Sequence, residues 1–185
     1  MYNTDDTSCG VYEEEDLDFD PSAPQTFTLT TYDWIIVDGP GVVHPVHAMV
    51  DPGPEPDRAK QVSRTVWNRI DELAGRNPGC KVVMAWDGKH NRAFRNTLNV
   101  SYKHGRVGRD PSIRYALAEV FRQARTRGYV QIVFPHYEAD DGIATLAKEL
   151  AGQRVLIVSE DHDLYQLITP TIHQHHFRNS TTQTP

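Results

Sequence analysis

The sequence predicts an α/β domain with a mostly parallel central sheet and helices on both of its faces. Short apolar runs alternate along the chain with segments in which apolar residues recur every three or four positions. The apolar runs are continuous, which is typical of strands with both faces covered. With 185 residues, the chain is long enough for one domain with a real core and short for two.

The expected elements alternate in type. Strands are expected over residues 32–38, 81–87, 130–134 and 154–159, and helices over 57–79, 110–128, 139–152 and 161–168. Asp57 can cap the first helix, and Gly128 follows the second one as a stop signal. Because each pair of strands is separated by a helix, the strands are expected to run parallel.

The two ends of the chain differ from its middle in composition. Residues 1–20 carry eight acidic side chains and no basic one, so residues 1–28 are expected to be a disordered acidic tail. This tail can serve solubility, or it can occupy a basic groove as a mimic of nucleic acid. We expect a folded domain over 29–178 and a disordered C-terminus over 179–185.

Charge and cysteine content narrow the class of protein. Outside residues 1–20, 19 Lys and Arg face 17 Asp and Glu, which permits a polyanionic partner although the whole chain is acidic. Cys9 and Cys80 form no CxxC motif, which argues against a disulfide scaffold or a cysteine zinc site. No apolar run approaches the roughly 18 residues of a membrane span. We therefore expect a soluble cytoplasmic protein.

Acidic side chains follow each of the four expected strands. They are Asp38, Asp87, Glu138, Asp140, Asp141, Asp161 and Asp163. The carboxyl ends of parallel strands share one edge, so these side chains are expected to converge on one crevice. Helix capping explains a single acid after a strand, but it does not explain acids after four successive strands. Clustered carboxylates repel one another, so this pattern favours divalent cations that neutralise their charge. Oxygen ligands select Mg²⁺ or Mn²⁺, and the number of acids favours two ions.

A basic stretch follows the second strand. No acid lies between Asp87 and Asp110, whereas cationic and aromatic side chains alternate there. Its candidate nucleic-acid contacts are Lys89, Arg92, Arg95, Tyr102, Lys103, Arg106 and Arg109. Cations can pair with phosphates while rings stack on bases, so the stretch is predicted to bind a single strand. A solvated basic loop is the alternative.

Four stretches together resemble the 5′-nuclease family, which includes flap endonucleases, bacteriophage 5′–3′ exonucleases and the 5′-nuclease domain of bacterial DNA polymerase I. They are "IIVDG", "MAWDGKHNRAFRNTLNVSYKHGR", "YEADDGIATLAKEL" and "VLIVSEDHDLYQLI". The resemblance implies a PIN-like sandwich, with residues 89–110 as an arch over a single strand. It also implies metal-dependent hydrolysis of DNA near a 5′ end or at a 5′-flap junction.

The resemblance also assigns roles to single residues. The seven acids match the family's metal ligands, with Asp87 and Asp141 among the residues needed for catalysis. Lys103 matches a lysine on the scissile phosphate, Arg106 a basic partner beside it, and Tyr102 an aromatic residue near the flanking bases. The larger members continue into a helix-three-turn-helix region that binds duplex, which is not in this sequence. We therefore expect duplex binding to come from elsewhere, from a partner chain, or not at all.

Two other functions stay open at this point. A PIN-type ribonuclease acting on single-stranded RNA would fit the short chain, although minimal PIN domains lack the arch. A non-catalytic module that binds DNA ends would fit the acidic tail, but it would gain nothing from seven clustered acids. The run "HQHH" over 173–176 is interpreted as an edge strand with exposed rings rather than as a transition-metal site.

Overall fold

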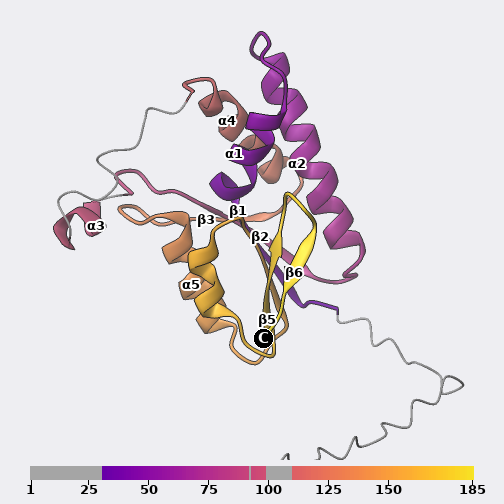
Figure 1. Cartoon of the computed structure of the whole chain (residues 1–185), viewed down its shortest axis with the longest axis vertical. Coiled ribbons are helices and arrows are strands. Elements are labelled where there is room, and N and C mark those ends of the chain that lie inside the picture. The colour runs from indigo at the N-terminus through magenta and orange to yellow at the C-terminus, as the bar shows by residue number, and fades with distance from the viewer. Residues whose placement is uncertain (1–30, 92, 99–109) are drawn as a thin grey trace, which may run out of the picture.

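The computed structural model describes residues 31–91, 93–98 and 110–185, and it forms one sheet covered by helices on both faces (Figure 1). The strands are β1 Trp34–Asp38, β2 Lys81–Trp86, β3 Val130–Val133, β4 Val155–Val158, β5 Ile172–His176 and β6 Thr181–Gln183. The helices are α1 Gly39–Met49, α2 Asp57–Gly75, α3 Ala93–Leu98, α4 Ile113–Thr126, α5 Ala139–Glu149 and the 3₁₀ helix η1 His162–Leu167.

The sheet confirms the predicted α/β class and the mostly parallel strands. Its order is β3-β2-β1-β4-β5-β6, and only the pairing of β5 with β6 is antiparallel. The topological switch point, where the order of strand addition reverses, lies beside β1. The chain continues from β1 to β2 and β3 on one side of β1, and then crosses to β4 on its other side. Open α/β sheets place their sites at the carboxyl ends of strands near such a point.

Alternate side chains of the central strands form two cores. Ile35 and Val37 face one side, where they pack with α1, α2 and α4, while Ile36 faces α5 on the other side. Figure 1 shows α1, α2 and α4 gathered together and α5 apart from them. β1 and β4 are buried on both faces, as expected for continuous apolar runs. β3 differs, since it is an edge strand whose Val130 and Val133 are exposed.

Helix α1 is the largest element that the sequence pattern does not predict. Its stretch "GPGVVHPVHAM" contains two prolines, and Pro45 lies inside the helix. Proline normally breaks a helix because it lacks an N–H and crowds the preceding turn. Burial of Val42, Val43 and Val46 in the core compensates here, and Asp38 caps the first turn.

The C-terminal segment corrects two expectations. Residues 179–185, expected to be disordered, contain β6, which pairs with β5. β5 is therefore not an edge strand, and its His175 and His176 rings are buried rather than exposed. The His175 ring hydrogen bonds to Thr182 of β6 at 3.0 Å, and the His176 ring hydrogen bonds to the Tyr165 hydroxyl of η1 at 2.6 Å, so β6 and η1 together explain the burial. No described helix combines the length and the apolar character that crossing a bilayer requires.

Candidate metal centre at the carboxyl edge of the sheet

The structure places the seven predicted acids at the same edge of the sheet. Asp38 ends β1, and Asp87 directly follows β2. Glu138, Asp140 and Asp141 surround the start of α5, and Asp161 and Asp163 lie at the start of η1, just beyond β4. These positions agree with the prediction from parallel strands, because the acids lie at the carboxyl ends of the strands or at the starts of the helices that follow them.

Asp38 is the most deeply placed of these acids. One carboxylate oxygen accepts a hydrogen bond from the Ser159 hydroxyl at 2.7 Å, and the other accepts from the backbone N–H of Gly41 at 2.9 Å. A side chain at position 41 would collide with this carboxylate, so glycine is required there. Burial raises the pKa of Asp38 to about 6, with the charges of Asp87 and Asp140 adding to the effect.

The start of α5 is held by one acid from the loop after β2 and by one from its own first turn. The Asp87 carboxylate accepts a hydrogen bond from the Ala139 backbone N–H at 3.0 Å, and Asp141 accepts from the Glu138 N–H at 3.1 Å. These bonds satisfy helix donors that otherwise lack partners, and the helix dipole favours the negative charge. Capping is therefore part of what these acids do. Asp38 likewise caps α1, but capping does not explain why Asp38 is buried and Asp140 half-buried, and this burial raises the pKa values of both carboxyls.

Arg95 lies among the acids at the start of α5. Its guanidinium contacts Glu138 at 2.9 Å, Asp140 at 2.7 Å and Asp141 at 3.1 Å. The side chains of Arg95 and Glu138 are only 24% and 7% exposed, so solvent screens these contacts weakly. Arg95 comes from α3, within the stretch predicted to bind nucleic acid. In this structure it compensates the carboxylates instead of facing outward.

Ser159 and Gln174 connect the β4 side of the edge to Asp38, and neither residue is among the site residues predicted from the sequence. The Ser159 hydroxyl, which donates to Asp38, accepts from the Asp161 N–H at 3.0 Å. The Gln174 amide donates to the backbone carbonyls of Ser159 and Asp161 at 3.1 and 2.8 Å. Both side chains are fully buried; a polar residue directly after the apolar run of β4 is the signal that could have identified Ser159, whereas the polar sequence of β5 offers none for Gln174.

The donor chemistry fits a hard divalent cation, but the acids are not gathered around one point. In the part of the chain that the structure describes, no three His, Cys, Asp or Glu side chains are arranged to hold a metal ion. All seven candidate ligands are carboxylates, which suits Mg²⁺ or Mn²⁺. A nearby cation stabilises most strongly a carboxylate whose pKa is raised by burial, as that of Asp140 is. In this structure Arg95 is the cation that compensates the charge of Glu138, Asp140 and Asp141.

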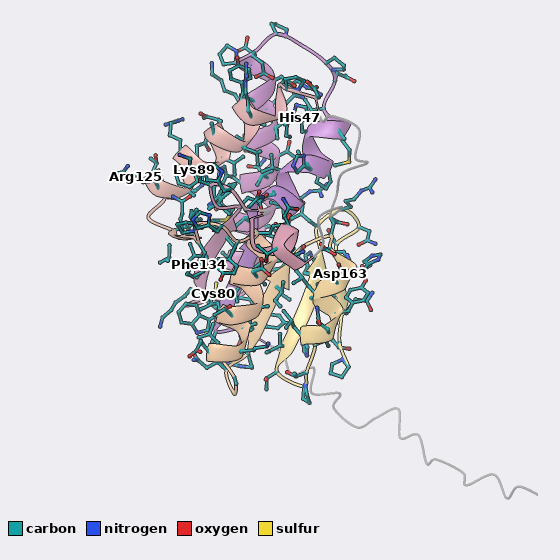
Figure 2. All side chains as sticks on the ribbon, turned by 90° about the vertical axis from the view of Figure 1, so that its left-hand side faces the viewer. His47, Cys80, Lys89, Arg125, Phe134 and Asp163 are labelled. Carbon is teal, nitrogen blue, oxygen red and sulfur yellow. The ribbon has the colours of Figure 1, made fainter. Side chains whose placement is uncertain are left out.

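The basic stretch is only partly within the described residues. Lys89 is exposed at the end of β2, and Figure 2 shows it on the opposite side of the view from Asp163. Its backbone carbonyl accepts a hydrogen bond from His136, and a side chain at Gly88 would collide with the Phe134 carbonyl, so the loops after β2 and β3 are packed tightly. The remaining candidates Arg92, Tyr102, Lys103, Arg106 and Arg109 lie outside the described residues.

With this geometry in place, sequence comparison identifies the family. The sequence profile described as "5′-3′ exonuclease, N-terminal resolvase-like domain" matches residues 33–184, which include all seven acids and the whole described sheet. The chain therefore belongs to this family of nucleases. The resemblance expected from the four sequence stretches is confirmed.

Curated relatives carry related names. A 5′-3′ exonuclease of Buchnera aphidicola subsp. Acyrthosiphon pisum is 30% identical over 102 residues, covering 54% of this chain and 35% of the relative. A protein of Photobacterium profundum called flap endonuclease Xni is 28% identical over 141 residues, covering 75% of this chain and 54% of the relative. The chain thus spans about a third to a half of the length of these relatives.

The fold also matches solved structures of nucleases. A crystal structure of the bacteriophage T5 flap endonuclease, a pseudo-enzyme-product complex with DNA and metal ions, superposes with a TM-score of 0.65. The match covers 82% of this chain and 57% of that chain at 18% identity. At this identity the match establishes the fold, which confirms the predicted PIN-like sandwich.

Proposed function

We propose that this chain hydrolyses DNA phosphodiester bonds near 5′ ends or at 5′-flap junctions, with Mg²⁺ or Mn²⁺ as cofactor. The observation that carries the proposal is the acidic edge, where Asp38, Asp87 and the acids of α5 meet beside the switch point of the sheet. The family membership and the names of the relatives support nuclease chemistry on DNA.

In this proposal each group of residues has a distinct task. The seven acids hold two divalent cations. Ser159 and Gln174 fix the positions of the acids on the β4 side of the edge. Bound cations supply the Lewis acidity that activates a water and stabilises the leaving oxygen. Lys103 and Arg106 bind the scissile phosphate, and Tyr102 stacks on a flanking base. Lys89, Arg92 and Arg109 pair with other phosphates of the strand.

The direct test uses a 5′-flap DNA labelled at its 3′ end, incubated with the purified protein in Mg²⁺, in Mn²⁺ and in EDTA. We expect cutting near the junction in both metals and none in EDTA. An RNA of the same sequence separates a DNA nuclease from a ribonuclease. Asp87→Asn is the inactive control, because asparagine keeps an acceptor for the Ala139 N–H while removing the charge. A folded protein that binds the flap and cuts in neither metal would indicate a binding module.

Replacing Lys103 with alanine is expected to slow cleavage tenfold or more while weakening DNA binding much less. A cation on the scissile phosphate stabilises charge that develops in the transition state, whereas one phosphate contact adds little to total affinity. Single-turnover rates and binding in EDTA measure the two effects separately. Lys60→Ala, which removes an exposed lysine of α2, is the matched control and should change neither. Equal losses in rate and affinity for Lys103→Ala would make it an ordinary phosphate contact.

A further inference from the structure

A pocket of about 470 Å³ lies beside the acidic edge, on the face of the sheet covered by α1 and α4. Its lining includes Trp86 and Asp87 at the end of β2, Val133 at the end of β3, and Leu117, Ala118 and Phe121 of α4. The volume falls in the usual range of small-ligand sites, roughly 300–1,000 Å³. Asp87, one of the candidate metal ligands, therefore belongs to both the acidic edge and this pocket.

The lining is mostly apolar and aromatic, with Asp87 and His44 as its polar members. Phe121 is 40% exposed and Val133 is 43% exposed, although both are large apolar side chains. The Phe121 ring packs against Trp86, with centroids 5.4 Å apart and planes inclined at 58°. The Trp86 indole N–H is satisfied by Gln131, so the pocket presents ring carbons rather than an unmet donor. Such a surface is suited to a flat, apolar-faced ring system.

The position of the pocket favours a nucleic-acid base as that ring system. The basic stretch leaves the sheet after Asp87 and returns to it at α4, which begins at Ile113. Both Asp87 and Ile113 line the pocket, so it lies between the two ends of this stretch. A strand whose phosphate is held at the acidic edge would pass close to the pocket mouth, because Asp87 belongs to both. Every base has a π-face, and stacking on an aromatic side chain requires no particular sequence.

We propose that this pocket binds one unpaired nucleobase of the DNA strand whose phosphate is held at the acidic edge. The inference rests on the proposed nuclease function and adds to it a site for a base. Burial of the base against Phe121 and Val133 fixes the position of the strand relative to Asp87. The pocket thus sets which phosphodiester bond lies at the acids.

Abasic DNA tests the proposal directly. A series of 5′-flap DNAs, each lacking one base at successive positions around the junction, is bound to the protein in Ca²⁺ and then cleaved in Mg²⁺. We expect one position, apart from the base on which Tyr102 stacks, where loss of the base weakens binding by about fivefold to 100-fold, the range for one stacked base. Loss of that base should also spread the cut over neighbouring bonds. Equal affinity at every position would overturn the proposal.

Two variants place the effect in this pocket. Ala118→Trp fills it from an exposed position on α4, and Phe121→Ala removes its exposed ring. Both variants should bind intact flap DNA as weakly as the wild type binds the DNA that lacks the base at the sensitive position. In both variants, removing that base should cause no further loss of binding. Ala151→Trp, at an exposed turn after α5, is the matched control and should behave as wild type. If both pocket variants keep the wild-type sensitivity, the base is bound elsewhere.

The outcomes separate this inference from the function on which it rests. If the wild-type protein cuts the flap and no abasic position is sensitive, the proposed function holds and the base site is refuted. The apolar pocket would then be assigned to a protein partner. Protein that neither binds nor cuts flap DNA refutes both. Cleavage with one sensitive position that is lost in Ala118→Trp supports both.

Discussion

Replacing Asp38 with asparagine is expected to abolish cleavage and to make the metal-free protein more stable above pH 6. The carboxylate is buried at the end of β1, and burial holds its pKa near 6 instead of the ordinary 3.8. Its negative charge is therefore unfavourable in the folded state without a cation. Asparagine has the same shape and caps helices well, so it can still accept from the Gly41 N–H. Loss of one cation-holding charge should cost at least about 100-fold in rate.

The pH dependence of this effect has a definite sign. Because the folded pKa of Asp38 is raised, the folded state holds its proton to a higher pH than the unfolded state does. The metal-free wild type therefore loses stability as pH rises from about 4 to about 6. The shift from 3.8 to about 6 corresponds to about 3 kcal/mol of unfolding free energy. Asp38→Asn should be more stable than wild type by about that amount at pH 8, and by little at pH 4.

Urea unfolding of both proteins in EDTA at the two pH values measures this difference, and contributions from titrating groups that do not interact with Asp38 cancel in the comparison. Asp33→Asn is the control, because Asp33 lies at the other end of β1 and its pKa is shifted in the opposite direction. Its pKa is lowered by hydrogen bonds from the Arg154 backbone and side chain, so removing its charge should bring no gain at pH 8. An Asp38→Asn protein that unfolds more easily than wild type at pH 8 would show that this carboxylate serves the fold.

The sequence predicts most of the sheet because its strands are strongly patterned. β1, β2 and β4 are apolar runs that end in acids or lead into them, and the alternation with helices dictates parallel pairing. Parallel pairing in turn brings the acids to one edge, since strand direction alone places their carboxyl ends together. The prediction of the acidic edge thus depends on topology, and it required no knowledge of side-chain contacts.

What the sequence could not predict depends on tertiary packing. Helix α1 contains Pro45 and forms because its valines enter the core, which local propensity opposes. The His175 ring is buried because β6 returns antiparallel, a pairing of three residues with no apolar pattern. Arg95 is drawn to the acids by charges more than 40 positions away. Pairings of this kind cannot be inferred from local sequence patterns.

Replacing Arg95 with alanine is expected to destabilise the metal-free protein and to strengthen its binding of Mg²⁺. The guanidinium contacts Glu138, Asp140 and Asp141, so its removal leaves three carboxylates uncompensated. Breaking a buried pair costs about 3–5 kcal/mol, and the partial exposure of Arg95 reduces this to about 2 kcal/mol. A cation that binds these acids must displace the guanidinium in the wild type but meets no competitor in the variant.

Thermal melting with and without Mg²⁺, and calorimetric titration of Mg²⁺ in the absence of DNA, measure both effects. We expect Arg95→Ala to melt lower than wild type in EDTA, to gain more from Mg²⁺, and to bind Mg²⁺ about tenfold more tightly, which corresponds to about 1.4 kcal/mol. Arg125→Ala, which removes an exposed arginine of α4, is the control for loss of one positive charge and should change neither quantity. Unchanged or weaker Mg²⁺ binding by Arg95→Ala would mean that Arg95 and the cation occupy different positions, so that the guanidinium supports the acids while the metal is bound.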